Sequence, residues 1–103
     1  MIDEEKIDHT YLPFDALDEV SRALMHGKDK YAEWLWITQP HRHRDLVAKA
    51  LRHIFAFMRG EDIDPASGCY HIACAICDLL FLQSNLIRNT GFDDRKIYPK
   101  KEK

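Results

Sequence analysis

Hydrophobic residues recur at helical spacing in three stretches of the chain. In the first stretch they form one apolar stripe, made of Leu17, Val20 and Leu24. We expect this helix to start near Asp15, which can cap it with Asp18 three positions later, in the manner of a capping box. Gly27 is typical of a helix end or a kink. Residues 28–36 would then continue as a broken helix that ends before Pro40.

The second stretch predicts a helix from Asp45 to Arg59, with two adjacent apolar lines along it. One line holds Leu46, Ala50, His53 and Phe57, and the other holds Val47, Leu51, Ile54 and Met58. The opposite face carries Lys49, Arg52, Ala56 and Arg59. Gly60 is a stop signal, so an amphipathic helix is expected to end there.

A third helix is predicted to begin at Asp64 and Pro65, an N-cap residue followed by proline at the first helical position. Residues 72–82 are apolar on nearly every side of this helix. The helix is expected to run to about Arg88, because Asn89 and Gly91 are stop signals. Such a helix is typical of a central element covered by its neighbours or by another subunit.

No segment shows the alternation that predicts strands, so the expected fold is all-α, a small helical bundle. A length of 103 residues allows one domain, 1–103, with frayed ends at 1–11 and 92–103. A domain of this size buries barely enough surface on its own. We therefore expect self-association.

Charge and composition exclude several classes of protein. The net charge of −2 lacks the basic excess that nucleic-acid binding brings. The N-terminus has no basic region followed by an apolar one, so we expect a cytoplasmic protein. The longest apolar run, 72–82, is far shorter than the roughly 20 residues of a membrane span. Three cysteines without a secretion signal are expected to be free thiols.

Asp78 is the most informative residue of the third helix, because it lies among apolar neighbours. An unpartnered carboxylate there would cost several kcal/mol, so the pattern requires a partner. One interpretation is a basic side chain of the second helix, such as His53; the other is a divalent metal. His71 lies seven residues earlier on the same helical face. Alone, His53 or His71 would be read as a satisfied core residue.

An acidic loop, Glu61, Asp62 and Asp64, precedes the third helix. Oxygen ligands suit Mg²⁺, which proteins often hold jointly with substrate phosphates. The alternative is that Asp64 caps the helix and the other two acids are solvated loop charges. Both interpretations stay open at the level of the residues.

The cysteines suggest a second kind of metal site. A string of possible zinc ligands comprises Cys69, His71, Cys74 and Cys77. Structural zinc sites usually draw ligands from a knuckle or turn, whereas Cys74 and Cys77 lie inside an apolar helix. Small buried cysteines pack well there, so packing is the preferred interpretation.

Residues 28–36 combine lysines, an acid and aromatic rings in a way that could hold a nucleotide. Lys30 would meet phosphate, Glu33 a metal, and Trp34 the base. The alternative is that the aromatic residues belong to the core or to an interface. The chain has no phosphate-cradling glycine loop, dinucleotide fingerprint or nucleophile elbow.

Three blocks of sequence carry a family resemblance. They run from Phe14 to Tyr31, from Ala50 to Asp62, and from Asp64 to His71, and the most specific part is Arg-His-x-x-Ala-x-x-Arg-Gly-Glu-Asp-x-Asp-Pro-x-Ser-Gly, residues 52–68. These blocks resemble the phage dATP/dGTP diphosphohydrolase family, within the MazG-like all-α nucleoside triphosphate pyrophosphatases. The similarity covers roughly residues 12–88.

The resemblance implies Mg²⁺-dependent cleavage between the α and β phosphates of a (d)NTP, by small helical subunits that form dimers or tetramers. Those enzymes hold their metals with Glu-x-x-Glu and Glu-x-x-Asp patterns on two neighbouring helices. Asp78 matches the aspartate of the second pattern, with Ala75 in place of its glutamate. The second helix departs further, because no carboxylate lies between Leu46 and Arg59.

These observations lead us to predict a Mg²⁺-dependent (d)NTP pyrophosphohydrolase, with Mn²⁺ able to substitute and a purine deoxynucleotide as substrate. The expected metal ligands are Glu33, Glu61 and Asp78, with Asp64 as a further ligand or cap. His53 and His71 are expected to orient water or phosphate, Lys30 and Arg59 to contact phosphates, and Trp34 to stack on the base. A homodimer or homotetramer is expected. The alternative is a non-catalytic helical interaction protein in which Asp78 pairs with His53.

Overall fold

The computed structural model describes residues 6–30 and 41–95, with the backbone alone for 28–30. It contains a short 3₁₀ helix, His9–Tyr11, and three α-helices: α1 (Phe14–Lys30), α3 (His43–Met58) and α4 (His71–Arg88). Within the described ranges there are two isolated β-bridges and no strand. The expected all-α fold is confirmed. The predictions for Glu33 and Trp34, and for the side chain of Lys30, lie outside the described residues.

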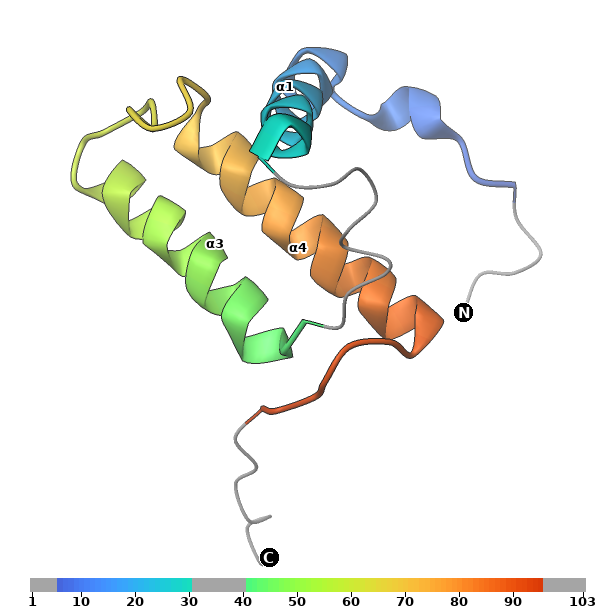
Figure 1. Cartoon of the computed structure of the whole chain (residues 1–103). Coiled ribbons are helices and arrows are strands. Elements are labelled where there is room, and N and C mark those ends of the chain that lie inside the picture. Colours follow the sequence, from blue (N-terminus) through green and yellow to red (C-terminus); the bar gives the residue numbers. More distant parts are fainter. Residues whose placement is uncertain (1–5, 31–40, 96–103) are drawn as a thin grey trace, which may run out of the picture.

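The helix α4 is the central element, since α3 packs along it and α1 packs against it as well. In Figure 1, α3 and α4 lie side by side and run in opposite directions, while α1 crosses the first half of α4. Val20 of α1 packs with Ala73 and Cys77 of α4 in one buried cluster. On α3, the buried residues that face the core include Leu46 and Ala50. This arrangement confirms the expectation that the third helix is central.

The first helix starts one residue before its expected cap, Asp15. It begins at Phe14, and Asp15 lies inside its first turn, where the carboxylate accepts a hydrogen bond from the N–H of Ala16. The helix also continues past Gly27 to Lys30. A single glycine costs a helix only about 1 kcal/mol, and no proline follows until residue 40, so the helix does not end at Gly27.

The third predicted helix starts six residues later than expected, at His71 instead of Pro65. Asp64 organises a turn instead of capping the helix, because its carboxylate accepts from the N–H of Ala66 and the hydroxyl of Ser67. Gly68 then takes a left-handed backbone conformation, with φ of 74°. This local bonding competes successfully with helix formation. The predicted stop at Asn89 is confirmed, since Asn89 is the left-handed C-cap of α4.

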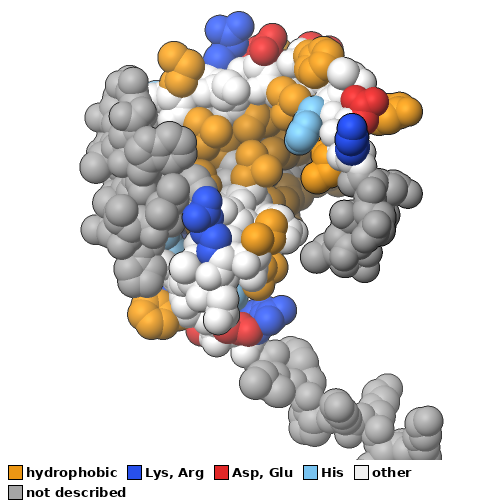
Figure 2. Space-filling view, turned by 90° about the vertical axis from the view of Figure 1, so that its right-hand side faces the viewer, with side chains coloured by type: hydrophobic (Ala, Val, Ile, Leu, Met, Phe, Trp, Pro, Cys, Tyr) orange, Lys and Arg blue, Asp and Glu red, His pale blue; other side chains and the backbone are white. Residues whose placement is uncertain are grey.

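Many apolar side chains remain exposed on this small bundle. Figure 2 shows hydrophobic side chains gathered in a hollow, with charged side chains around its edge. Exposed apolar residues of α3 and α4 include Val47, Leu51, Phe55, Leu79, Leu80 and Leu86. No helix in the described part of the chain has the length and hydrophobicity needed to cross a lipid bilayer. A surface this apolar is typical of an interaction face.

Replacing Gly91 by alanine should destabilise the fold by about 1–3 kcal/mol. Gly91 has a φ of 79°, and a Cβ there would lie 2.8 Å from the carbonyl oxygen of His41. The matched control is Gly27→Ala, where no described atom lies within 4 Å of the new Cβ and the residue is inside α1. Alanine should stabilise that helix by about 0.5–1 kcal/mol. Urea unfolding measures the change in the free energy of unfolding for both variants. Changes of the same sign would contradict the prediction.

Candidate active site

Two histidines meet where α3 ends and α4 begins. His53 lies in the last third of α3 and His71 is the first residue of α4. Their Nδ1 atoms are 2.9 Å apart, and the Nε2 of His71 is 2.6 Å from Oε1 of Glu61. The loop is fixed to the helix because the backbone N–H of His71 donates to the carbonyl of Asp62. Glu61, His71 and His53 therefore form one continuous hydrogen-bonded row.

This row determines which nitrogen of each neutral imidazole carries the proton. A carboxylate only accepts hydrogen bonds, so Nε2 of His71 donates to Glu61. The Nδ1 of a neutral His71 then accepts, and Nδ1 of His53 donates to it. Burial lowers the pKa of His53, which favours its neutral form. The Nε2 of His53 is left with a free lone pair.

Asp64 and Cys74 complete the cluster around His53. One ligand atom from each of these three side chains lies within 4.8 Å of the others. Burial acts to raise the pKa of Asp64, but its hydrogen bonds from Ala66 and Ser67 hold the pKa below the ordinary value. Burial raises the pKa of the Cys74 thiol, and the nearby charges of Asp64 and Asp78 raise it further. The site is thus an anionic cluster with one imidazole.

Asp78 lies one helical turn beyond Cys74, on the same face of α4. Burial raises its pKa to about 6, against the opposing charges of Lys49 and Arg52 on α3. Among the described residues, no hydrogen bond or ion pair reaches this carboxylate. The expected pair with His53 is wrong, because His53 is turned toward His71.

The four-residue zinc string is not assembled as a set. The thiol of Cys77 is buried against the carbonyl oxygen of Val20, which confirms its assignment to packing. His71 is bonded to Glu61 and His53 instead of to a cysteine. Cys74, in contrast, faces His53 and Asp64, so packing does not describe it fully.

The structure thus brings four predicted residues together, and a fifth lies one turn away. His53, His71, Glu61 and Asp64 form the cluster and Asp78 follows it along α4. Arg59 stays exposed at the C-cap of α3. Sequence reasoning placed Lys49 and Arg52 on the far face of their helix, yet both charges act on Asp78. A sequence signal for Arg52 existed, since it directly precedes His53 in the motif.

The comparisons with known proteins agree with the resemblance that these residues carry. The family model described as dATP/dGTP diphosphohydrolase, N-terminal, matches residues 2–95. No curated protein and no solved structure gives a significant match. The matched region includes all three helices and the whole cluster around His53. The chain therefore belongs to the dATP/dGTP diphosphohydrolase N-terminal family.

Proposed function

We propose that the protein hydrolyses a purine deoxynucleoside triphosphate, dATP or dGTP, to the monophosphate and pyrophosphate. The observation that carries this proposal is the family match over residues 2–95, since the family is described by that activity. The cluster at the junction of α3 and α4 supports it, because carboxylates, imidazoles and cations gather there. Such groups serve phosphoryl transfer through charge neutralisation and positioning of water.

The carboxylates fit Mg²⁺ or Mn²⁺ by their chemistry, because these cations prefer oxygen ligands. Asp78, without a hydrogen-bonding or ionic partner in the described part of the chain, is the strongest of these donors. Glu61 has only one oxygen bonded to His71, and Asp64 follows in the same loop. Glu33 is proposed as a further ligand. The bound cation would neutralise phosphate charge and lower the pKa of a water molecule.

Further roles are proposed for the remaining side chains. His53 and His71, joined by a hydrogen bond between their Nδ1 atoms, would orient water or a phosphate oxygen. The carboxylate of Glu61 would stabilise a positive charge on the pair of imidazoles, through its hydrogen bond to His71. Arg52 and Lys49 are placed to attract phosphates near Asp78. Lys30 and Arg59 are proposed as further phosphate contacts, and Trp34 as a surface for the base.

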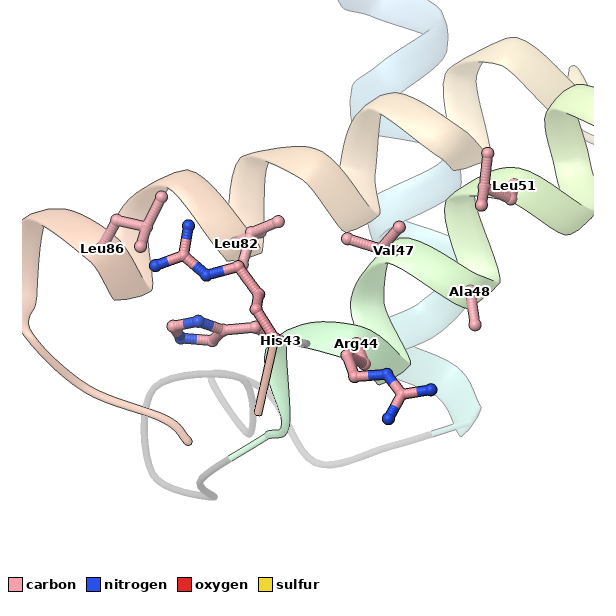
Figure 3. A pocket seen from close by; sticks show the side chains of 8 residues that line it. His43, Arg44, Val47, Ala48, Leu51, Leu82 and Leu86 are labelled. Carbon is pink, nitrogen blue, oxygen red and sulfur yellow. The ribbon is translucent and has the colours of Figure 1, made fainter. Parts of the chain in front are cut away.

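The apolar groove between α3 and α4 supports assembly into a homodimer or homotetramer. Its volume is about 500 Å³. Figure 3 shows that it is lined by residues of α3 and α4, together with Arg95: His43, Arg44, Val47, Ala48, Leu51, Leu82 and Leu86. A small bundle gains stability when a second copy covers such a surface. Light scattering behind a sizing column should give a mass of two or four chains.

Incubation with each (d)NTP and Mg²⁺, followed by separation of the products, tests the proposed reaction. We expect monophosphate and pyrophosphate in equal amounts, and faster turnover of dATP or dGTP than of pyrimidine nucleotides. Asp78→Asn, purified in the same way, controls for contaminating phosphatases. An absence of turnover with Mg²⁺ and with Mn²⁺ would overturn the proposal. It would favour the non-catalytic interaction protein that the exposed apolar faces also suit.

A further inference from the structure

We propose that His53, Asp64 and Cys74 bind a resident cation of the Zn²⁺ type. The three side chains come from three different places: α3, the loop before α4, and α4 itself. The inference does not depend on the proposed nucleotide chemistry, because it concerns the affinity of the chain for a metal alone.

The donor set is the first argument. An imidazole nitrogen, a carboxylate oxygen and a thiolate sulfur form a mixed set that suits Zn²⁺. Mg²⁺ binds oxygen ligands and is not expected to recruit Cys74 or His53. In the proposed reaction, Mg²⁺ would be held with the substrate phosphates. Zn²⁺ and Mg²⁺ therefore prefer different donor sets, although the carboxylate of Asp64 could bind either ion.

The spacing is the second argument. The three ligand atoms lie within 4.8 Å of one another. Ligands of a tetrahedral zinc ion stand about 3.3–3.8 Å apart, from bond lengths of about 2.0–2.3 Å. The cluster must close by about 1 Å, which side-chain rotations can supply. Three protein ligands leave one coordination position open, as in catalytic zinc sites.

The surrounding hydrogen bonds are the third argument. His53 donates through Nδ1 to His71, which Glu61 holds in place, so Nε2 of His53 is free to bind a cation. The Asp64 carboxylate is fixed by the N–H of Ala66 and the hydroxyl of Ser67. Metal sites use such outer hydrogen bonds to orient their ligands. Packing alone would not require three donors to converge, with two of them held in orientation by hydrogen bonds.

Charge favours a cation as well. Asp64 and Asp78 both act electrostatically on Cys74, so the immediate surroundings of the thiol are anionic. Lys49 and Arg52 act on Asp78 but are exposed on the surface of α3. A divalent ion at His53 would be attracted by Asp64, whose charge acts on His53 more strongly than the opposing charge of Arg52.

Co²⁺ and Zn²⁺ binding to the chelator-treated, reduced protein tests the site without nucleotide. We expect about one ion per chain and a sulfur-to-cobalt charge-transfer band. Cys74→Ser should abolish the band and weaken Zn²⁺ binding by at least about 100-fold, more than loss of an outer hydrogen bond causes. The matched control is Cys69→Ser, a half-buried thiol bonded to the carbonyl of Ser67, which should keep the band. Circular dichroism checks that both variants fold.

X-ray absorption of the Zn²⁺-loaded wild-type protein provides a result that does not depend on any variant folding. We expect one sulfur and two or three nitrogen or oxygen neighbours. A shell without sulfur, a shell with two sulfurs, equal loss of the band in both cysteine variants, or no retained zinc would each overturn the proposal. If the protein binds zinc but hydrolyses no nucleotide, the proposed function is wrong and the zinc site is supported. If it hydrolyses nucleotide but binds no zinc, the zinc site is wrong and the proposed function is supported.

Discussion

Replacing Asp78 by asparagine should remove most nucleotide turnover and also make the protein more stable at neutral pH. The two effects have one cause, because this carboxylate is half-buried and has no hydrogen bond or ion pair in the described part of the chain. If Asp78 serves a cation and phosphates, its loss should lower turnover by at least about 100-fold, the scale for removing one transition-state contact. Product formation from dATP and dGTP measures this.

The stability effect has a definite sign with pH. Burial raises the pKa of Asp78 to about 6 from an ordinary value of 3.8, so the folded state binds more protons between those values. The contribution of Asp78 to the free energy of unfolding should therefore fall as pH rises from about 4 to 6 and stay low above that, which the difference between the wild type and Asp78→Asn isolates. Asparagine carries no charge and should remove this slope. The gain at pH 7 is on the order of 1–2 kcal/mol, since one pKa unit is worth about 1.4 kcal/mol and water still reaches part of the side chain.

Urea unfolding between pH 4 and 8 measures the slope for the wild type and for Asp78→Asn. Asp18→Asn is the matched control, because Asp18 is exposed on α1 and should change neither slope nor turnover. A less stable Asp78→Asn protein at pH 7 would mean that the carboxylate is a structural partner. Full turnover by Asp78→Asn would show that Asp78 has no role in the reaction.

Replacing Leu46 by alanine should cost about 2–5 kcal/mol of stability. Leu46 is 2% exposed, and among the described residues it is the large side chain that is most completely buried. It lies on α3 where that helix packs on α4. The free energy of unfolding of a small domain is about 5–15 kcal/mol in all, so this one change can remove a large part of it.

Leu80→Ala is the matched control for Leu46, with the same atoms removed from a side chain that is 47% exposed. We expect a cost below about 1 kcal/mol there, because little area returns to water. Thermal and urea unfolding at low protein concentration measure both variants. Equal losses would show that Leu80 is buried in solution, as an assembly of chains would require.

Helix number and type could be predicted from the sequence because they depend on local information. The apolar periodicity includes Val20 and Leu46, which are buried, but also Val47 and Leu51, which remain exposed. The helix ends were predicted less accurately. Asp64 satisfies the signal for an N-cap, but the hydrogen bonds to Ala66 and Ser67 form a turn with the same side chain.

Part of the candidate site could also be predicted, because it too depends on local information along the chain. Glu61, Asp64, His53 and His71 stand in two adjacent blocks of sequence, and the structure gathers them at one end of α3 and α4. The partners of these residues were not found, because a partner on another helix depends on how the helices are placed against each other. His53 therefore meets His71 and Cys74 instead of Asp78.

The sequence by itself determined that this chain is helical and that its loop acids and histidines belong together, because spacing along the chain carries that information. The packing of α3 on α4 decided the remainder. It set Cys74 beside His53 and Asp64, and it left Asp78 half-buried near Lys49 and Arg52. Distances between residues of different helices arise only when the helices pack, and the chemistry of the site rests on those distances.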